Sequence, residues 1–423
     1  MKIKKVKAIE ILDSRGKPTI RTFVFLDNNV FASSSVPSGA STGSHEAVEL
    51  RDNDKNRYHG AGVLKAVDNV NNIIAQKLIN QNLDENSFEK IDKLMIELDG
   101  TKNKSQLGAN AILSVSQALI KVFAISTKKP LWQVLNEVYF SDVTPDFPRL
   151  MVNVVNGGKH AGWNFDIQEF MISPTSNTST QSVRIASEIF QQLGKNLKKQ
   201  GLSTLVGDEG GYSPELTSNE QVFEEIIKAA SDLNYQNEKD YHLAIDAAAS
   251  EFYQDGSYIF KKENKKLNND ELIDYYKALK EKYHIFSFED PFAENDWQGF
   301  QKFLQVLSLS RTEPTRTVPL IVGDDLYTTN PEYIEKGIKE KATNAVLIKP
   351  NQIGTIYETA KAINLAQKNN WKIIISHRSG ETEDPFIADL AYGCASDFIK
   401  TGSMSRSERL AKYNRLIEIE NHL

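Results

Sequence analysis

From residue 209 onward, seven ionisable side chains each follow a short apolar run. They are Glu209, Asp246, Glu289, Asp324, Lys349, His377 and Lys400. Neighbouring members of this series are 23 to 43 residues apart, close to the length of one strand plus one helix. In a barrel of parallel strands, the carboxyl ends of the strands meet at one mouth. The spacing therefore predicts that these side chains converge on a single site.

Three of these residues are carboxylates and two are lysines, which narrows the chemistry of the site. Asp246, Glu289 and Asp324 offer hard oxygen ligands, and the series contains no cysteine and no pair of histidines. Ligands of this kind favour a cation such as Mg²⁺ over zinc. The alternative is that the acids only pair with lysines and helix ends, although burying so many charges rarely adds stability. We therefore expect a divalent metal site.

Four polar segments add groups that can contact a ligand. The segments 38–45 (SGASTGSH) and 155–160 (VNGGKH) either close over a ligand or form ordinary surface turns. In the segment 207–211 (GDEGG), glycines on both sides give the acids open access to the mouth. In the segment 377–380 (HRSG), Arg378 offers a planar guanidinium that suits a phosphate group.

The elements that must position these groups fall into two regions. In the first region, extended segments at 6–12, 19–26 and 30–35 are joined by short polar turns, which favours an antiparallel meander. Apolar residues at three- and four-residue spacing then predict a helix over 63–74 and a helix rich in small residues over 108–122.

The second region begins after a linker with two prolines at 144–148 and alternates apolar runs with helical patterns. Most of the runs are continuous, as in strands buried on both faces of a parallel sheet. The predicted strands are 150–155, 169–172, 205–207, 243–245, 285–288, 320–322, 345–348, 373–375 and 398–399. The predicted fold class is α/β, with a (β/α)8-type barrel at residues 143–423 after a smaller α+β domain at residues 1–142.

Composition excludes several other classes of protein. The 423 residues include 50 Lys and Arg against 56 Asp and Glu, a formal charge of −6 without a concentrated basic tract, so no nucleic-acid partner is expected. No uninterrupted apolar stretch approaches the ~18 residues of a membrane span, and the basic N-terminus lacks the apolar core of a signal peptide. The single cysteine, Cys394, suits a packing role in a reducing compartment. We expect a cytoplasmic protein without a transmembrane segment.

Motifs in a fixed order along nearly the whole chain resemble those of the enolase family. They are DSRG at 13–16, SGASTG at 38–43, LGANA at 107–111, NGG at 156–158, QEFM at 168–171, GDEGG at 207–211, EDP at 289–291, GDDL at 323–326, NQIG at 351–354, SHRSGETED at 376–384, KTG at 400–402 and RSER at 406–409. The resemblance implies a barrel with an irregular ββαα start and a homodimer or octamer of dimers. It also implies reversible dehydration of 2-phospho-D-glycerate to phosphoenolpyruvate and water in glycolysis.

The resemblance assigns metal-binding roles to four positions. Asp246, Glu289 and Asp324 would hold one Mg²⁺ against the substrate carboxylate. Ser41 would help to bind a second Mg²⁺ with the substrate phosphate, which makes two ions in each active site. Their positive charge would stabilise the enediolate that forms when the proton beside the carboxylate is removed.

The resemblance also assigns the acid and the base. A lysine base beside Mg²⁺ is a recognised arrangement in enolase-superfamily sites, and Lys349 matches that position. Burial, Mg²⁺ and Lys400 would have to lower its pKa from about 10.4. Glu209 matches the general acid, with Glu169 in its network. The residues expected to bind the substrate are His160, Glu169, Lys349, His377, Arg378, Ser379 and Lys400, of which Lys400 contacts the carboxylate and Arg378 and Ser379 contact the phosphate.

The sequence departs from the family's pattern at Lys17, Trp163-Asn164, Ser287-Phe288 and Asp397-Phe398, and none of these changes removes a matched catalytic group. The last pair places a charge and an aromatic ring beside the strand that ends in Lys400.

Two alternative functions remain open. The first is another enolase-superfamily lyase that acts on a different carboxylate, although Arg378, Ser379 and the Ser41 segment favour a phosphorylated substrate. The second is an additional scaffold or surface-binding role. Enolases that capture plasminogen often expose lysines at the C-terminus, whereas this chain ends in Asn421-His422-Leu423. A secondary location at the cell surface therefore has no support in the sequence.

Overall fold

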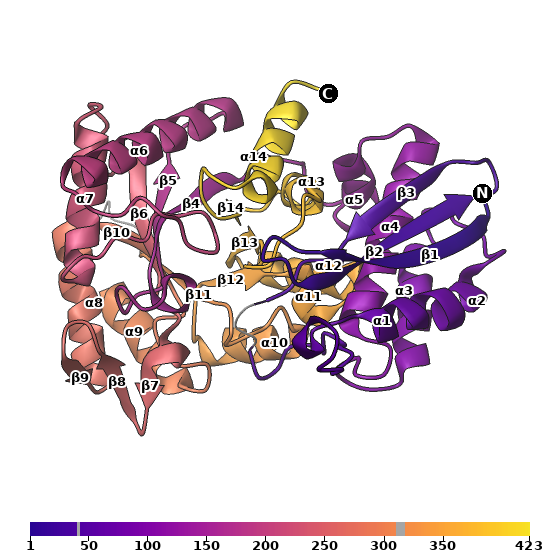
Figure 1. The fold of residues 1–423 in the computed structure, drawn as a ribbon, viewed down its shortest axis with the longest axis horizontal. Coiled ribbons are helices and arrows are strands. Elements are labelled where there is room, and N and C mark those ends of the chain that lie inside the picture. The colour runs from indigo at the N-terminus through magenta and orange to yellow at the C-terminus, as the bar shows by residue number, and fades with distance from the viewer. Residues whose placement is uncertain (40–42, 310–317) are drawn as a thin grey trace.

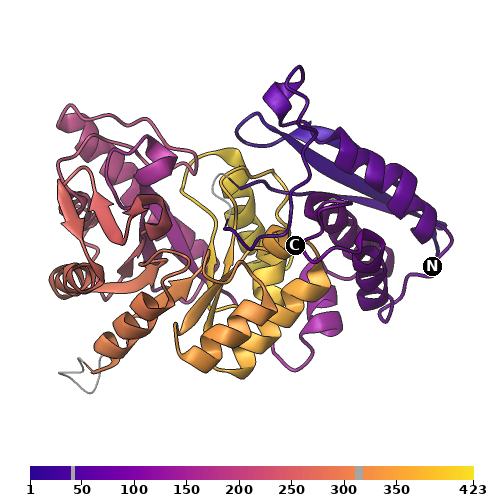
Figure 2. The same ribbon diagram turned by 90° about the horizontal axis from the view of Figure 1, so that it is seen from below.

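A smaller N-terminal unit lies beside a larger barrel in the computed structural model (Figure 1), and a view from below shows the same arrangement (Figure 2). The structure describes residues 1–39, 43–309 and 318–423. The chain passes from one unit to the other between Tyr139, where a helix ends, and Arg149, where the first barrel strand begins. The domain boundary expected at residues 142 and 143 lies within this connection and stays a prediction.

The N-terminal unit is an antiparallel sheet covered by helices. Its strands form the predicted meander of β1 (Ile3–Leu12), β2 (Pro18–Leu26) and β3 (Phe31–Ser35). Its helical segments are α1 (Leu64–Asp68), a π-helical stretch (Asn69–Ile74), α2 (Ala75–Leu78), α3 (Phe88–Asp99), α4 (Ala109–Thr127) and α5 (Leu131–Tyr139). Small side chains let α4 approach the sheet closely, since Ser114 Oγ lies 2.6 Å from Thr22 Oγ1.

Helix α4 is the one described helix that is long and apolar enough to cross a membrane. Its most apolar window has a mean hydropathy of 1.5, but 83% of that window is buried inside the protein. Burial against the sheet and the neighbouring helices explains the apolar composition of α4, which is the pattern of a core helix.

Eight strands close into the barrel. In spatial order they are β4 (Arg149–Asn156), β5 (Glu169–Pro174), β6 (Tyr241–Asp246), β10 (Ile285–Glu289), β11 (Leu320–Gly323), β12 (Ala345–Ile348), β13 (Lys372–Ser376) and β14 (Phe398–Lys400). Only β5 runs antiparallel to its two neighbours. Two helices, α6 (Ser179–Lys199) and α7 (Asn219–Ser231), follow it before β6. The irregular ββαα start implied by the family resemblance is therefore present.

One predicted barrel strand is wrong. Residues 205–207 lie in the connection between α6 and α7, where Val206 forms only an isolated bridge with Tyr212. Leu205 is 77% exposed, so this run does not contribute to the barrel core. A run with only two apolar residues is too short to distinguish a strand from a loop that happens to contain them.

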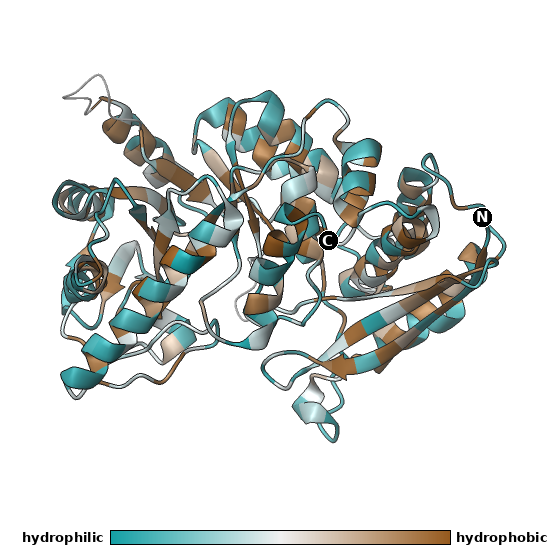
Figure 3. Cartoon of the chain, turned by 90° about the horizontal axis from the view of Figure 1, so that it is seen from above, coloured by the Kyte–Doolittle hydropathy of each residue, from teal (hydrophilic) through white to brown (hydrophobic). Residues whose placement is uncertain are grey.

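The remaining helices and a small sheet cover the outside of the barrel. The helices are α8 (Asn269–Tyr283), α9 (Trp297–Leu309), α10 (Pro331–Glu340), α11 (Pro350–Ile353), α12 (Ile356–Lys368), α13 (Phe386–Gly393) and α14 (Ser407–Glu420), and the small sheet contains β7 (Tyr253–Gln254), β8 (Ser257–Phe260) and β9 (Lys265–Leu267). Figure 3 shows apolar colour on the barrel strands and polar colour on outward helix faces. The sequence encodes helix ends locally, as in the capping box between Asn268 and Glu271 at the start of α8.

The inside of the barrel is filled by apolar side chains. Met151, Met171, Ala244, Val322 and Leu347, here called the interior layer, are all fully buried. Because this layer closes the barrel like a packed core, the polar groups at its mouth are separated from its opposite end.

Candidate active site

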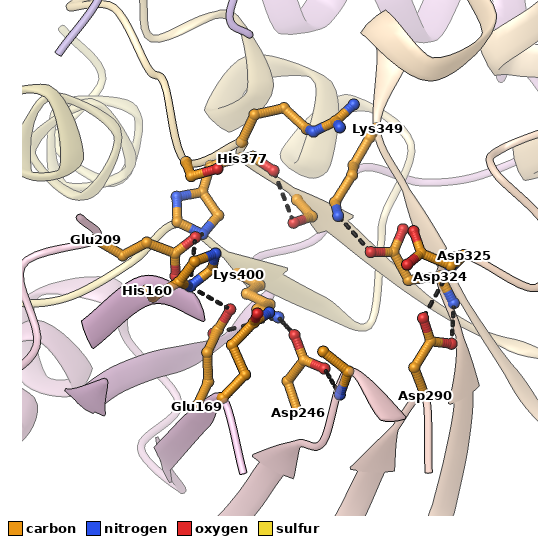
Figure 4. A pocket seen from close by; sticks show the side chains of 15 residues that line it. His160, Glu169, Glu209, Asp246, Asp290, Asp324, Asp325, Lys349, His377 and Lys400 are labelled. Atoms are coloured by element: carbon orange, nitrogen blue, oxygen red, sulfur yellow. Dashed lines mark hydrogen bonds and ion pairs between the residues drawn. The ribbon is translucent and has the colours of Figure 1, made fainter. Parts of the chain in front are cut away.

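The charged residues at the strand ends meet at the mouth of the barrel, as predicted. Asp246, Glu289 and Lys400 are the last residues of β6, β10 and β14, and Asp324, Lys349 and His377 directly follow β11, β12 and β13. Five of these six residues line one pocket (Figure 4). The sixth, Glu289, lies behind Lys400 and binds its ammonium group. The convergence of the carboxyl ends of barrel strands at one mouth therefore explains the position of most of these residues.

Glu169 and Glu209 reach the same pocket by other routes. Glu169 is the first residue of β5, and the antiparallel direction of this strand places it opposite Asp246 at the mouth. Glu209 comes from the loop between α6 and α7, which passes very close to its neighbours. A Cβ atom on Gly207 would lie 2.7 Å from the His160 carbonyl oxygen. Gly210, with φ of +88°, adopts a backbone conformation that favours glycine.

Lys400 is the electrostatic centre of the pocket floor. Its Nζ atom lies 2.8 Å from Glu289 Oε2, 3.1 Å from Asp246 Oδ2 and 3.2 Å from Glu169 Oε2. Burial lowers the pKa of Lys400, but these carboxylates outweigh burial and hold the pKa well above its ordinary value. Lys400 therefore stays protonated and provides fixed positive charge.

Lys349 lies on the opposite wall and forms an ion pair with Asp324. Asp324 also accepts a 3.0 Å hydrogen bond from Gln352 Nε2. Burial lowers the pKa of Lys349, but the charge of Asp324 outweighs burial, so the pKa lies above its ordinary value. The lowered pKa expected of a base is therefore not present while Asp324 pairs with Lys349.

The carboxylates at the mouth carry more negative charge than the lysines balance. Burial and the charge of Asp246 raise the pKa of Glu289 well above its ordinary value. On the adjoining wall, oxygens of Asp290, Asp324 and Asp325 lie within 4.8 Å of one another, and burial together with Asp324 raises the pKa of Asp325 to about 8. A buried surplus of hard oxygen donors suits a divalent cation.

The three predicted ligands differ in their present contacts. Asp246 and Glu289 share Lys400, whereas Asp324 binds Lys349. Asp290, which the sequence argument did not single out, accepts the backbone N–H groups of residues 324 and 325 at 2.9 and 2.8 Å. These bonds fix the start of the segment that carries Asp324. Ser41, the fourth predicted ligand, lies outside the described residues.

Glu169 and Glu209 form a buried carboxylate pair near His160. The Nδ1 atom of His160 lies 3.8 Å from Glu169 Oε1 and 3.7 Å from Glu209 Oε1. Burial and then the charge of Glu209 raise the pKa of Glu169 well above its ordinary value. Burial also opposes ionisation of Glu209, but His377, His160 and Arg409 hold its pKa below the ordinary range. The pair can therefore store one proton, which rests on Glu169.

Arg409 fixes the position and tautomer of His377, a role that the sequence argument missed. Arg409 is fully buried on α14, and its Nη1 donates 2.7 and 2.6 Å hydrogen bonds to His377 Nδ1 and the Arg378 carbonyl. The proton of the neutral imidazole must then lie on Nε2, which faces Glu209 Oε1 at 3.5 Å. The only sequence signal was its place in the RSER motif.

Acid is expected to destabilise the protein through His377. Burial lowers the pKa of His377 to about 4, whereas an unfolded histidine titrates near 6.5. Between these values the unfolded chain binds the extra proton, so the free energy of unfolding falls by about 3 kcal/mol as the pH drops through this window. Urea unfolding at several pH values should show a shallower loss for His377→Asn and an unchanged loss for His59→Asn, which alters an exposed histidine. An equal pH dependence of the free energy of unfolding in the wild type, His377→Asn and His59→Asn would contradict the role of His377.

The predicted phosphate-binding residues lie where the N-terminal unit meets the mouth. Ser38 and Gly380 exchange backbone hydrogen bonds of 2.8 and 2.9 Å, which joins the two units. Arg378 holds Glu46 with two hydrogen bonds of 3.0 Å, and Ser379 follows it at the pocket wall. The guanidinium thus already binds an oxyanion in the two-pronged way that a phosphate would use.

The unusual pair Asp397-Phe398 leaves the mouth undisturbed. Asp397 accepts a 2.6 Å hydrogen bond from Lys372 Nζ and a 3.0 Å bond from the Ile373 N–H. Phe398 packs with the apolar cluster inside the barrel. The charge of Asp397 and the ring of Phe398 therefore have their contacts away from Lys400.

A barrel whose mouth combines carboxylates that could hold a metal ion, two lysines and a protonatable carboxylate pair defines an acid–base enzyme of the α/β-barrel class. The family models described as "Enolase, N-terminal domain" and "Enolase, C-terminal TIM barrel domain" match residues 3–135 and 145–423. Two relatives named "Enolase", from two strains of Ureaplasma parvum serovar 3, are each 50% identical over 436 aligned positions that cover 100% of this chain and 97% of theirs. The chain belongs to the enolase family, a family of hydro-lyases. Membership implies a divalent metal and a small-molecule substrate.

Proposed function

We propose that Lys349 and Glu209 carry out the reversible dehydration of 2-phospho-D-glycerate to phosphoenolpyruvate and water, a step of glycolysis. The observation that carries this proposal is the placement of Lys349 and the Glu169–Glu209 pair on opposite walls of one pocket (Figure 4). A base and an acid on opposite faces of a substrate suit an anti elimination.

The residues of this chain account for both protons. The neutral Lys349 amine removes the proton beside the substrate carboxylate, and Glu209 donates a proton to the departing hydroxyl, which leaves as water. Glu169 can return its stored proton to Glu209. A metal that shared the charge of Asp324 would leave burial as the largest influence on the pKa of Lys349, which would favour the neutral amine.

Other groups hold the negative charge of the substrate. Lys400 faces the substrate carboxylate, and Arg378 with Ser379 faces the phosphate, which would take the place of Glu46. His160 and His377 close the wall beside Glu209. We propose that Asp246, Glu289 and Asp324 hold one Mg²⁺ and that Ser41 contributes to a second. Bound Mg²⁺ supplies positive charge that stabilises the developing enediolate.

Removal of metal is expected to abolish turnover. The purified chain should convert 2-phospho-D-glycerate with a rise in the ultraviolet absorbance of the conjugated product when Mg²⁺ is present. Activity should disappear with excess chelator and return with added Mg²⁺, because the surplus of buried carboxylates at the mouth needs a cation. A rise that is insensitive to chelation would contradict the metal assignment. Turnover of a different carboxylate substrate alone would favour another superfamily lyase.

We also propose a cytoplasmic location and a homodimer or octamer of dimers. The buried thiol of Cys394 is compatible with a reducing compartment, and the assembly follows from the family resemblance. Cell fractionation tests the location, and light scattering coupled to size-exclusion chromatography tests the assembly. A monomeric mass would exclude both assemblies.

A further inference from the structure

A second pocket lies at the end of the barrel opposite the mouth. It has a volume of about 430 Å³ and is lined by residues at the starts of strands, including Arg149, Phe286, Leu320, Lys372 and Phe398. Parallel strands that end at the mouth must begin at the other end, so this pocket is far from the catalytic groups. The interior layer lies between the two pockets.

Arg149 occupies an unusual position in this pocket. Its guanidinium lies 5.5 Å from the ring centre of Phe398 and 5.9 Å from that of Phe286. Its Nε and Nη2 atoms are buried and have no hydrogen-bond partner in the described part of the chain. These two N–H groups share one edge of the guanidinium, the edge that holds a carboxylate or phosphate with two parallel hydrogen bonds.

Leaving these groups unpaired is unfavourable. A buried donor without a partner keeps the full unfavourable free energy of desolvation, and this free energy is larger for a charged group. Burial accordingly lowers the pKa of Arg149. The aromatic rings offset part of this cost through cation–π contacts, but they accept no strong hydrogen bond from the edge. Among the residues that the structure describes, Arg149 therefore lacks the anion that buried arginines normally bind.

The lining of the pocket attracts anions. Besides Arg149 it includes Lys280 and Lys372, and within the described residues its only acid is Glu238. Glu238 lies 3.6 Å from His284 Nδ1, and Lys372 binds Asp397 outside the pocket. Lys280 forms no ion pair within the described residues. Arg149 and Lys280, which form no ion pair within the described residues, therefore make the pocket electropositive.

We propose that this pocket binds a small organic oxyanion, a phosphate or carboxylate carried on an apolar body. The anionic group would meet the unpartnered edge of Arg149, with Lys280 nearby, and the apolar body would contact Phe286 and Leu320. Arg149 as a residue is only half-buried, and its Nε and Nη2 donate no hydrogen bond within the described residues. Turning this edge toward a ligand therefore breaks no hydrogen bond.

Phenyl phosphate and benzoate test the two sources of the anionic group, and benzyl alcohol provides a neutral control. Titration calorimetry with the full chain in excess chelator should show saturable binding of at least one anion and no binding of the alcohol. Arg149→Gln should weaken that binding at least about tenfold, because two charge-assisted hydrogen bonds are lost. Lys280→Gln, a change at a half-exposed position, should weaken it by a smaller factor.

The variant Arg378→Gln distinguishes binding in this pocket from binding at the mouth, because Arg378 lines the mouth and not this pocket. Binding that survives Arg378→Gln but is lost in Arg149→Gln supports the proposal, and the dehydration rate of Arg149→Gln should stay within about twofold of the wild type because the interior layer separates the sites. If Arg149→Gln does not fold, the response of Lys280→Gln decides. The proposal is overturned if neither anion binds, if the alcohol binds equally well, or if only Arg378→Gln abolishes binding.

Discussion

Replacing Lys349 with methionine is expected to lower the turnover of 2-phospho-D-glycerate by about four orders of magnitude, the upper range for loss of an acid–base group. Methionine keeps the apolar stem of the side chain but cannot accept the proton beside the substrate carboxylate. Loss of the ammonium group also frees Asp324 from its ion pair. Mg²⁺ binding measured by calorimetry should therefore be retained or strengthened while the absorbance assay shows almost no product.

Lys368→Met is the matched control because Lys368 lies exposed at the end of α12, away from the pocket. It should leave turnover unchanged. Turnover of Lys349→Met near that of the wild type would exclude Lys349 as the base. Lys400 would then be the remaining lysine in the pocket to examine.

Replacing Glu209 with glutamine is expected to produce the second large loss, about a hundredfold to ten-thousandfold in dehydration. Glutamine preserves the shape of the side chain and can still accept the 3.1 Å hydrogen bond from Asn153 Nδ2. It cannot supply an acidic proton to the departing hydroxyl. Steady-state assays should therefore show a fall in kcat with a much smaller change in KM.

The buried carboxylate pair makes a comparison with Glu169→Gln informative. The stored proton rests on Glu169, so this variant should also be slowed, because Glu209 loses its proton supply. Glu215→Gln is the control, since Glu215 is an exposed acid in the same connection. Full activity of Glu209→Gln together with an inactive Glu169→Gln would make Glu169 the direct donor and overturn the assignment of Glu209.

Much of the site could be predicted from local sequence, because residues at the carboxyl ends of successive barrel strands meet at one mouth. An acid or lysine after an apolar run was enough to place Asp246, Asp324, Lys349 and Lys400 at one mouth. The same rule placed Glu209 at the mouth for the wrong reason, because Glu209 lies in a loop and not at the end of a strand. Its true position depends on close packing at Gly207 and Gly210, which no local pattern reports.

Other features depend on contacts between distant segments. Arg409 is 32 residues from His377 in sequence, and only the folded chain shows that one orients the other. Asp290, like Asp324, is an acid next to the end of a barrel strand. Its carboxylate, however, accepts hydrogen bonds from backbone N–H groups. In the sequence, Arg149 directly precedes the predicted strand 150–155, as an ordinary surface charge would. That its Nε and Nη2 have no hydrogen-bond partner among the described residues is seen only in the folded chain, where Phe286 and Phe398 pack around it.

The exchange of the substrate proton with solvent tests the central claim most directly. Proton NMR in D₂O should follow the signal beside the carboxylate of 2-phospho-D-glycerate with wild type, Lys349→Met and Glu209→Gln, each with Mg²⁺. The account predicts that Glu209→Gln still exchanges this proton although it dehydrates slowly, because Lys349 is intact. Lys349→Met should neither exchange nor dehydrate. Exchange that persists in Lys349→Met, or that disappears in Glu209→Gln alone, would contradict the division of roles across this pocket.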